Sequence, residues 1–377
     1  MLPPRLIRRL LLVPLVVVIA AGLAALTPPV ALLTVVLNLV RRRPEREPGA
    51  KPVRHGRLLR VIFLALTWAV GETAALTALL GLWIAGGFGG RLDTEPYRTR
   101  HYGVMAWFLD LIYRAVQRAC GLRVEVAAPP DASLLGDRPV IVLSRHAGPG
   151  DSLLLVHYLL TDCERRPRVV MKATLQLDPS IDIVANRLPN AFLRRPRVAA
   201  PVAKASGRAN GRRQSEQIRQ VRRLAVGLDQ RGALLLFPEG GNWTPLRWRR
   251  GIERLRRQGR AGLADRAAAM PNLLPPREGG AFAAVGACPD ADVIFVAHTG
   301  LDRLVSVRDI WQSMRADLVV HARWWRVAAA DLPRTADHDT QVGWLYDWWE
   351  RIDAWITETS SDGTAVAAPS VVSESGE

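Results

Sequence analysis

The sequence predicts an α/β fold in which a mixed sheet is flanked by helices and preceded by N-terminal membrane helices. Two long apolar stretches open the chain of 377 residues. From about residue 97 onward, short apolar runs alternate with amphipathic stretches, which is typical of layered α/β domains. Residues 359–377 lack periodicity and are rich in small and polar side chains, as in disordered tails. We therefore predict a membrane-anchoring region at 1–96, an α/β domain at 97–358 and a disordered tail at 359–377.

The anchoring region contains two candidate membrane segments. Residues 10–40 carry no charge, and residues 61–90 carry only Glu72. Each segment exceeds the roughly 20 apolar residues that cross a bilayer as a helix. A signal peptide is the alternative for the first segment, but its apolar character continues past any plausible cleavage site and a second segment follows. Glu72 is expected to have a polar partner or to lie near the interface, because a carboxylate in hydrocarbon is costly.

The basic flanks of these segments leave two arrangements open. Arginines precede residue 10, and the loop at 41–60 is densely basic, so each flank favours the cytoplasmic side. Either the first segment re-enters by bending at Pro28 and Pro29, where a regular helix is interrupted, or both segments are ordinary spans. We expect a bacterial-type inner or plasma membrane, with the α/β domain on the cytoplasmic side.

The net charge indicates an anionic partner. Lys and Arg number 51 against 35 Asp and Glu, which gives a formal charge of +16 and attracts polyanions. We expect membrane lipids and no nucleic acid, because basic clusters flank the apolar segments and no zinc-finger spacing or aromatic nucleotide-binding signature is present. Cys120, Cys163 and Cys288 are scattered, so neither a disulfide framework nor a metal site is predicted. The oligomeric state is left open.

The globular part is predicted from its apolar runs. A helix is expected over 104–120, and "GRRQSEQIRQVRRLAVGLDQRG" predicts a basic amphipathic helix. Polar residues that follow the strands of one sheet gather along one edge, where α/β proteins place their sites. Four runs predict buried strands: "RPVIVLSRH", "RPRVVMKATL", "GALLLFPEGG" and "DADVIFVAHTG".

The turn after the first of these strands carries the candidate chemistry. In "RHAGPGD", His146 and Asp151 flank a Gly-Pro-Gly turn, which lets Asp151 fold back beside His146 while capping the next helix. A carboxylate on one imidazole nitrogen makes the other a better general base. By itself this spacing fits a capping aspartate with an incidental histidine. Ser144 is a poor nucleophile candidate, since no G-x-S-x-G elbow surrounds it.

Further motifs resemble a known family. "RHAGPGD", "PNAFLRR", "FPEGGNW" and "IFVAHTG" resemble, in order, the four blocks of the glycerolipid acyltransferases, the 1-acylglycerol-3-phosphate acyltransferase superfamily, over about residues 97–310. "FPEGGNWTP" and "NLLPPREGGAF" are most similar to the branch of lysocardiolipin and lysophosphatidylinositol acyltransferases. The sequence departs from the family at Arg145 (Asn in the family), Pro189 (Gly) and Ala297 (Pro), and it lacks the Thr-Arg-Ser of the third block.

The resemblance implies a fold like that of glycerol-3-phosphate acyltransferase and a transfer reaction. His146 takes the proton of an acceptor hydroxyl, Asp151 orients His146, and a thiol leaves. The implied co-substrate is acyl-CoA or acyl-carrier protein, the acceptor is a lysophospholipid, and no cofactor, metal or covalent acyl-enzyme is expected. The open alternatives are an inactive lipid-binding scaffold of the same fold and an acyltransferase acting on a glycolipid or amino lipid.

The resemblance also implies substrate-binding residues. Arg195, with Arg194 beside it, is expected to bind the acceptor phosphate, because a guanidinium matches phosphate oxygens. Glu239 is expected to bind glycerol hydroxyls or to anchor that arginine, and Gly240 and Gly241 to allow close approach of substrate to the backbone. Lys172 is either a contact to the acyl donor's phosphate or a cation at a strand end. Replacement of the missing third-block arginine, or a solvated or lipid-facing basic face, is expected of Arg247, Arg249 and Arg250. Headgroup depth is expected for Trp243, Trp248, Trp324 and Trp325, with some of them in ordinary core.

Overall fold

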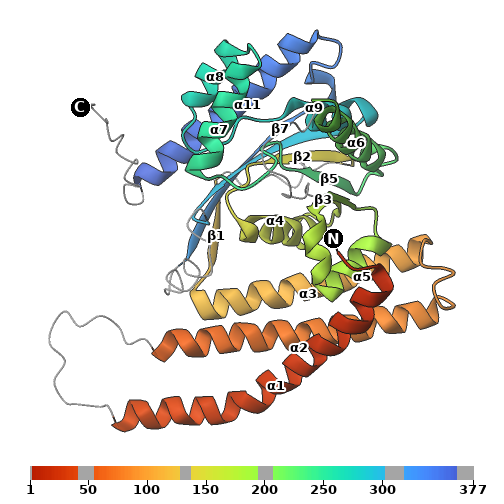
Figure 1. Cartoon of the computed structure of the whole chain (residues 1–377), viewed down its shortest axis with the longest axis vertical. Coiled ribbons are helices and arrows are strands. Elements are labelled where there is room, and N and C mark those ends of the chain that lie inside the picture. The colour runs from red at the N-terminus through yellow and green to blue at the C-terminus, as the bar shows by residue number, and fades with distance from the viewer. Residues whose placement is uncertain (1, 41–54, 128–136, 194–206, 302–317, 363–377) are drawn as a thin grey trace.

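A computed structural model describes residues 2–40, 55–127, 137–193, 207–301 and 318–362. Within these ranges, seven strands form one sheet in the order β1-β7-β6-β2-β5-β3-β4 (Figure 1). The strands are β1 (Arg123–Ala127), β2 (Val140–Ser144), β3 (Arg166–Lys172), β4 (Ala191–Leu193), β5 (Gly232–Leu236), β6 (Asp292–Thr299) and β7 (Val319–Val327). The four strands predicted from apolar runs are β2, β3, β5 and β6, and they form the centre of the sheet.

Strand directions make this a mixed sheet, as predicted. Five neighbouring strands run parallel to one another: β6, β2, β5, β3 and β4. β7 is antiparallel to β6, and β1 is parallel to β7. The carboxyl ends of the four central strands therefore share one edge. Three strands were not predicted, namely β1, β4 and β7, because β4 has three residues and the other two carry charged residues between apolar ones.

Alternate residues of the central strands face two helical layers. Val140 and Val142 pack with Leu155 and Leu159 of α4 (Pro149–Thr161) on one face. The intervening residues Ile141 and Leu143 belong to a second core on the other face, where α6 (Gly207–Ala225), α9 (Glu278–Ala287) and α11 (His338–Asp362) lie (Figure 1). Burial on both faces explains why β2, β5 and β6 appear in the sequence as continuous apolar runs.

The remaining helices differ from prediction mainly at their ends. α3 (Glu95–Cys120) begins before the expected start at residue 104. α11 continues to Asp362, so residues 359–362 are helical and are wrongly placed in a disordered tail; residues 363–377 lie outside the described residues. The other helical segments are η2 (Ala173–Leu177), α5 (Pro179–Arg187), α7 (Pro245–Arg257), α8 (Ala261–Ala268) and η3 (Ala329–Asp331).

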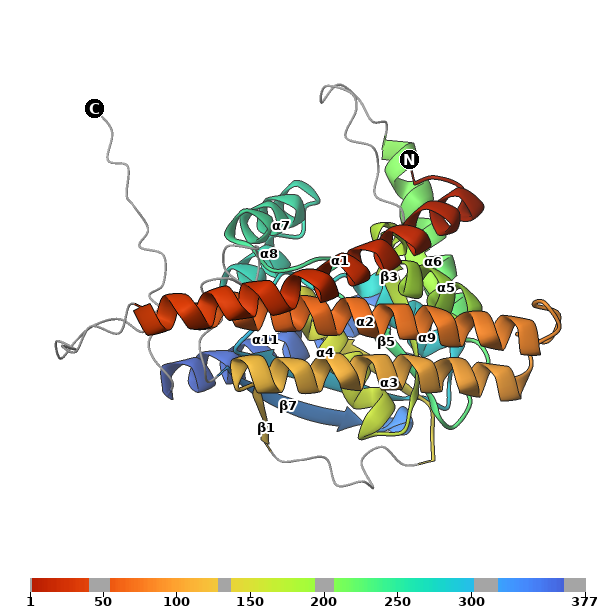
Figure 2. The same ribbon diagram turned by 90° about the horizontal axis from the view of Figure 1, so that it is seen from below.

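The two apolar N-terminal helices lie against the domain. α1 (Arg5–Val40) packs on α2 (His55–Ala85), α2 on α3, and α3 on α4, so they form successive layers below the sheet in the view of Figure 1. Seen from below, α1, α2 and α3 lie side by side (Figure 2). By length and composition, Arg5–Val30 and Leu58–Ala85 are each suited to cross a membrane. α1 stays helical through Pro28 and Pro29, so a re-entrant bend at these prolines is wrong. Apolar membrane helices tolerate prolines because neighbouring groups compensate for the lost N–H bonds.

Polar contacts fix these helices to α5. The carboxylate of Glu72, buried in α2, accepts the backbone N–H of Ser180 at 2.8 Å, which is the polar partner expected for it. Arg8 and Arg9 of α1 form ion pairs with Asp182 at 2.5 and 2.9 Å. The anchoring helices are therefore joined to the α/β domain by specific contacts as well as by chain connectivity.

Candidate active site

One aspartate shapes the turn after β2. β2 ends at Ser144 and α4 begins at Pro149. Asp151, in the first turn of α4, accepts the backbone N–H groups of Ala147 at 2.7 Å and Gly148 at 3.0 Å. N–H groups at a helix start have no partner within the helix, so Asp151 caps α4 and also closes the turn.

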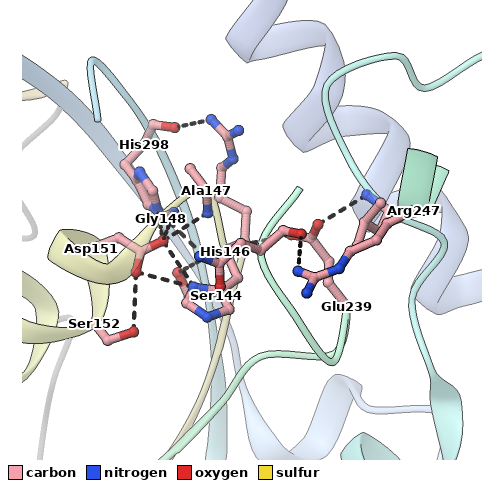
Figure 3. A network of polar contacts seen from close by, with 12 residues as sticks. Ser144, His146, Ala147, Gly148, Asp151, Ser152, Glu239, Arg247 and His298 are labelled. Atoms are coloured by element: carbon pink, nitrogen blue, oxygen red, sulfur yellow. Dashed lines mark hydrogen bonds and ion pairs between the residues drawn. The ribbon is translucent and has the colours of Figure 1, made fainter. Parts of the chain in front are cut away.

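The same carboxylate holds the imidazole of His146. The Nδ1 atom of His146 lies 3.1 and 3.0 Å from the two carboxylate oxygens of Asp151 (Figure 3). The Asp151 side chain is 1% exposed and that of His146 is 11% exposed. Burial opposes ionisation of Asp151, but the hydrogen bond from His146, the charges of His298 and His146, and the N–H of Gly148 outweigh it and lower the pKa to about 2. An ionised Asp151 keeps the His146 proton on Nδ1 and leaves Nε2 as a proton acceptor.

The loop after β5 holds His146 from the other side. The ring of Phe237 lies against the imidazole, with 4.5 Å between ring centroids. The N–H of Trp243 donates to the His146 carbonyl at 2.9 Å. The side chain of His146 is therefore oriented by α4, whereas its backbone is held by the loop that carries the third motif.

Glu239 of that loop is a buried brace. Its carboxylate accepts the N–H of His146 at 2.7 Å and the N–H of Leu274 at 2.9 Å, and the residue is 3% exposed. Burial raises its pKa to about 8, although the charge of Arg145 and the two N–H donors favour the ionised form. In this structure its oxygens bind backbone N–H groups, whereas glycerol hydroxyls or an arginine were the expected partners. A contact with substrate stays a prediction.

Arg145 points away from His146. Successive side chains of an extended segment point to opposite faces, and the Arg145 guanidinium donates to the carbonyls of His298 at 2.5 Å and Asn272 at 3.4 Å. Only 2% of Arg145 is exposed. The arginine in place of the family's asparagine thus joins the end of β6 to the turn at Asn272.

Two arginines cover the Gly240–Gly241 turn. Gly240 has a φ of +69°, and a Cβ built there meets the guanidinium of Arg277 at 3.0–3.1 Å. A Cβ on Gly241 meets the guanidinium of Arg247 at 3.2 Å, and Arg247 donates to the Asn242 carbonyl at 2.8 Å. A side chain at either position would displace one of these guanidinium groups, and Gly240 also has a backbone conformation that favours glycine.

Comparison with known proteins places this geometry in a family. Residues 123–298 match the family model described as Acyltransferase. The chain contains an acyltransferase-family domain. The match runs from the start of β1 to His298, which confirms the resemblance to the glycerolipid acyltransferase superfamily; the nearer likeness to the lysocardiolipin branch stays a prediction.

Other comparisons add two findings. A search of curated proteins finds no significant match. A solved structure, the 1-acyl-sn-glycerophosphate (LPA) acyltransferase PlsC from Thermotoga maritima, is similar to this chain at 15% sequence identity and a TM-score of 0.45. The similarity covers 82% of this chain and 99% of that one.

The remaining predicted site residues of the acyltransferase domain lie at the same sheet edge or outside the described residues. Lys172 is the last residue of β3 and pairs in register with Leu193 of β4. β5 separates β3 from β2, so Lys172 lies two strands away from the strand that leads to His146. Arg194 and Arg195 fall outside the described residues, and their roles stay predictions.

The acyltransferase domain also contains site residues that the sequence analysis did not single out. Arg277 directly follows "LLPP", and its guanidinium lies on Gly240, which is distant from it in the sequence. His298 lies near the end of β6, with its Nε2 atom 3.7 Å from a carboxylate oxygen of Asp151. The sequence carried one indication of His298: it lies two residues after Val296 on a predicted strand, and residues at this spacing share one face of a sheet.

A cavity of about 370 Å³ runs along α4, beginning at Asp151. Asp151 and His298 line one part of it, and Thr161 at the other end of α4 lines another. Ten residues separate Asp151 from Thr161, so the cavity follows about 15 Å of helix. Its walls are mainly apolar and include Leu154, Leu155, Val296, Val320, Ala322 and Trp324.

Three of the tryptophans expected at headgroup depth are half-buried. Trp248 donates to the carbonyls of Ala267 and Met270, Trp324 packs on Tyr158, and Trp325 contacts Trp348 and Trp355 of α11. Their position relative to lipid headgroups stays a prediction. Among the described residues, no group of three His, Cys, Asp or Glu side chains is arranged to hold a metal ion.

Proposed function

We propose that this acyltransferase domain transfers a fatty acyl group from a thioester to the free hydroxyl of a lysophospholipid such as 1-acylglycerol-3-phosphate. The donor is acyl-CoA or acyl-carrier protein. The observation that carries the proposal is the buried hydrogen bond between His146 Nδ1 and an ionised Asp151. This arrangement supplies a general base without a nucleophilic side chain, which suits attack by an alcohol on an already activated acyl group.

The proposed reaction has two proton transfers. The Nε2 atom of His146 takes the proton of the lysolipid hydroxyl as its oxygen attacks the thioester carbonyl and forms a tetrahedral intermediate. The carbon–sulfur bond then breaks, and the departing sulfur receives the proton from His146. The products are an ester and a free thiol, and His146 returns to its neutral form. Asp151 stabilises the imidazolium that exists between the two transfers.

Arginines near the dyad support an anionic acceptor. Arg277 and Arg247 lie on the Gly240–Gly241 turn, which directly follows Glu239, the residue that binds the N–H of His146. A phosphate bound by these guanidinium groups would lie close to the base, and a guanidinium provides paired donors for phosphate oxygens. Arg195 stays a candidate for the same phosphate from the sequence motif.

The cavity along α4 supports an acyl substrate. A hydrocarbon chain gains free energy for each methylene removed from water, about 0.8 kcal/mol, and the cavity offers mainly apolar walls. Because Asp151 and His298 line one part of the cavity, a chain held there has its carbonyl near the dyad. We propose that this cavity holds the acyl group of the donor.

The apolar helices support a membrane location. Large apolar side chains of α1 and α2 are exposed, among them Leu10, Val18, Leu26, Phe63 and Leu80. Such a surface is favourable in lipid and unfavourable in water. We propose that α1 and α2 hold the domain at the inner or plasma membrane, on its cytoplasmic side, where a lysolipid can reach the site without leaving the bilayer.

The proposal is tested by assaying the purified full chain in detergent. Labelled acyl-CoA and acyl-carrier protein are each supplied with a panel of lysophospholipids, a lysoglycolipid and a lyso amino lipid. We expect transfer to a phosphate-bearing acceptor and loss of at least about 10²-fold in kcat with His146→Gln, the range of general base catalysis. Ser144→Ala should keep activity, because no serine nucleophile is proposed.

The other outcomes identify the alternatives. Absence of transfer with every acceptor, in a protein that still binds lipid vesicles, would support a scaffold of the same fold. Transfer only to the glycolipid or amino lipid would change the acceptor and leave the base in place. Loss of activity in Ser144→Ala with retention in His146→Gln would refute the mechanism.

A further inference from the structure

Strand register brings a second imidazole to the dyad. In the parallel pair of β2 and β6, Ser144 lies opposite Val296. His146 lies two residues after Ser144, and His298 lies two residues after Val296. Both imidazoles therefore stand at the same level and on the same face of the sheet. α4, which carries Asp151, covers that face. The register therefore places one carboxylate beside two histidine rings.

The contacts of His298 agree with this placement. Its Nε2 atom lies 3.4 Å from the carbonyl oxygen of Arg145 and 3.7 Å from a carboxylate oxygen of Asp151. Both neighbours are acceptors, which favours the neutral tautomer with the proton on Nε2. The His298 side chain is 8% exposed and, with Asp151, lines the cavity along α4.

We propose that His298 is a positioning residue for the transfer reaction, which acts on the base His146 through the carboxylate they share. The inference rests on the proposed function. When His298 is neutral, its Nε2–H faces Asp151 and Arg145 and leaves the carboxylate to stabilise one imidazolium, that of His146. When His298 is protonated, two cations compete for one carboxylate and His146 becomes a weaker base. Activity therefore requires both rings to be neutral before substrate binds.

Charged groups around His298 come from several elements. The guanidinium of Arg145 donates to the carbonyl of His298 itself and opposes a second positive charge. The carboxylate of Glu239 accepts the backbone N–H of His146. On β7, His321 pairs in register with Thr299 and lies 3.3 Å from Glu125. Among these groups, Asp151 is the carboxylate that directly faces the His298 ring, and its lowered pKa includes a contribution from the charge of His298.

The pH dependence of activity provides the first test. Wild-type log(kcat/KM) should approach a slope of two on the acid side, because two imidazoles must lose protons. His298→Gln keeps an N–H donor and has no titratable group, so its slope should fall to one while the plateau stays within about tenfold of wild type. His321→Gln is the matched control, a histidine on the neighbouring strand that is 39% exposed, and its slope should equal that of wild type.

A titration of the histidine rings by ¹⁵N NMR provides a test that does not need activity. Asp151→Asn should lower the midpoint of His298 by about one pH unit or more, the effect of losing an opposite charge within about 4–6 Å, and should leave His321 unchanged. An unchanged acid limb in folded His298→Gln, or an unchanged His298 midpoint in Asp151→Asn, would overturn the inference. If wild type transfers no acyl group at all, the proposed function fails instead, and the NMR result still decides whether the two rings share Asp151.

Discussion

Replacement of Asp151 by asparagine separates its two roles. In wild type the carboxylate accepts backbone N–H groups from Ala147 and Gly148 and, in addition, the Nδ1–H of His146. The carbonyl oxygen of an asparagine can still accept from the two backbone groups, so the turn and the cap of α4 should form. The amide nitrogen is then directed at His146 Nδ1 as a donor. This stabilises the tautomer with the proton on Nε2, which cannot accept a proton from an alcohol.

The size of both effects follows from the structure. Loss of the correct tautomer should lower kcat by about 10⁴-fold, as the same substitution does in a Ser-His-Asp triad. The stability effect should be smaller. The pKa of Asp151 is lowered from 3.8 to about 2, which corresponds to about 2 kcal/mol of stabilisation at neutral pH. Because a lowered carboxyl pKa stabilises the folded state above the unfolded pKa, this contribution is lost as the pH falls below about 4 and through 2.

Two measurements check the prediction together. Single-turnover transfer gives the chemical step, and thermal unfolding between pH 3 and 7 gives the stability of Asp151→Asn relative to wild type. The difference in stability should shrink on acidification. Asp265→Asn, at an exposed carboxylate of α8, serves as the control and should change neither quantity. A folded Asp151→Asn protein that keeps kcat within tenfold of wild type would refute the assignment of His146 as the base.

Three further substitutions test the loop that carries the third motif. Arg277→Ala should raise KM for a phosphate-bearing lysolipid by about tenfold, the loss of one charge-assisted hydrogen bond of about 1.5 kcal/mol, and leave KM for an uncharged acceptor unchanged in steady-state assays. Gly240→Ala should destabilise the protein by about 1–2 kcal/mol in thermal melts, since an alanine is strained at a φ of +69° and its Cβ meets Arg277; a neutral effect would contradict the close approach. For Glu239→Gln, the expected change is in the pH dependence of stability. The folded pKa of about 8 exceeds the usual 4.5, so wild type loses stability as pH rises from about 4.5 to 8, by up to about 1.4 kcal/mol per unit, and melting curves of the variant should lack this slope.

The sequence predicts the centre of the fold better than its edges. β2, β5 and β6 are buried on both faces and therefore appear as unbroken apolar runs. β7 is half-buried and places two adjacent tryptophans between two arginines, a pattern that suggests headgroup contacts when no neighbouring strand is known. Its place beside β6 depends on long-range pairing, which leaves no local mark in the sequence.

The site shows the same division between local and distant contacts. His146 and Asp151 are five residues apart, and the Gly-Pro-Gly turn between them predicts that they meet. The brace from Glu239, the guanidinium of Arg277 and the ring of His298 come from other loops and strands. Motif order indicates that such segments are near one another, but only the register of β2 with β6 shows that His298 stands level with His146.

Two buried carboxylates hold His146, and their pKa values are shifted in opposite directions. Asp151 is bonded to the ring and surrounded by N–H donors and imidazoles, which keep its pKa near 2. Glu239 binds the backbone N–H of the same residue, but deeper burial raises its pKa to about 8. Environment thus assigns the two carboxylates different tasks: Asp151 controls the basicity of the ring, whereas Glu239 controls where the ring stands. Substitutions at Asp151 should therefore change the pH profile and kcat, whereas substitutions at Glu239 should displace His146 and weaken transfer at every pH.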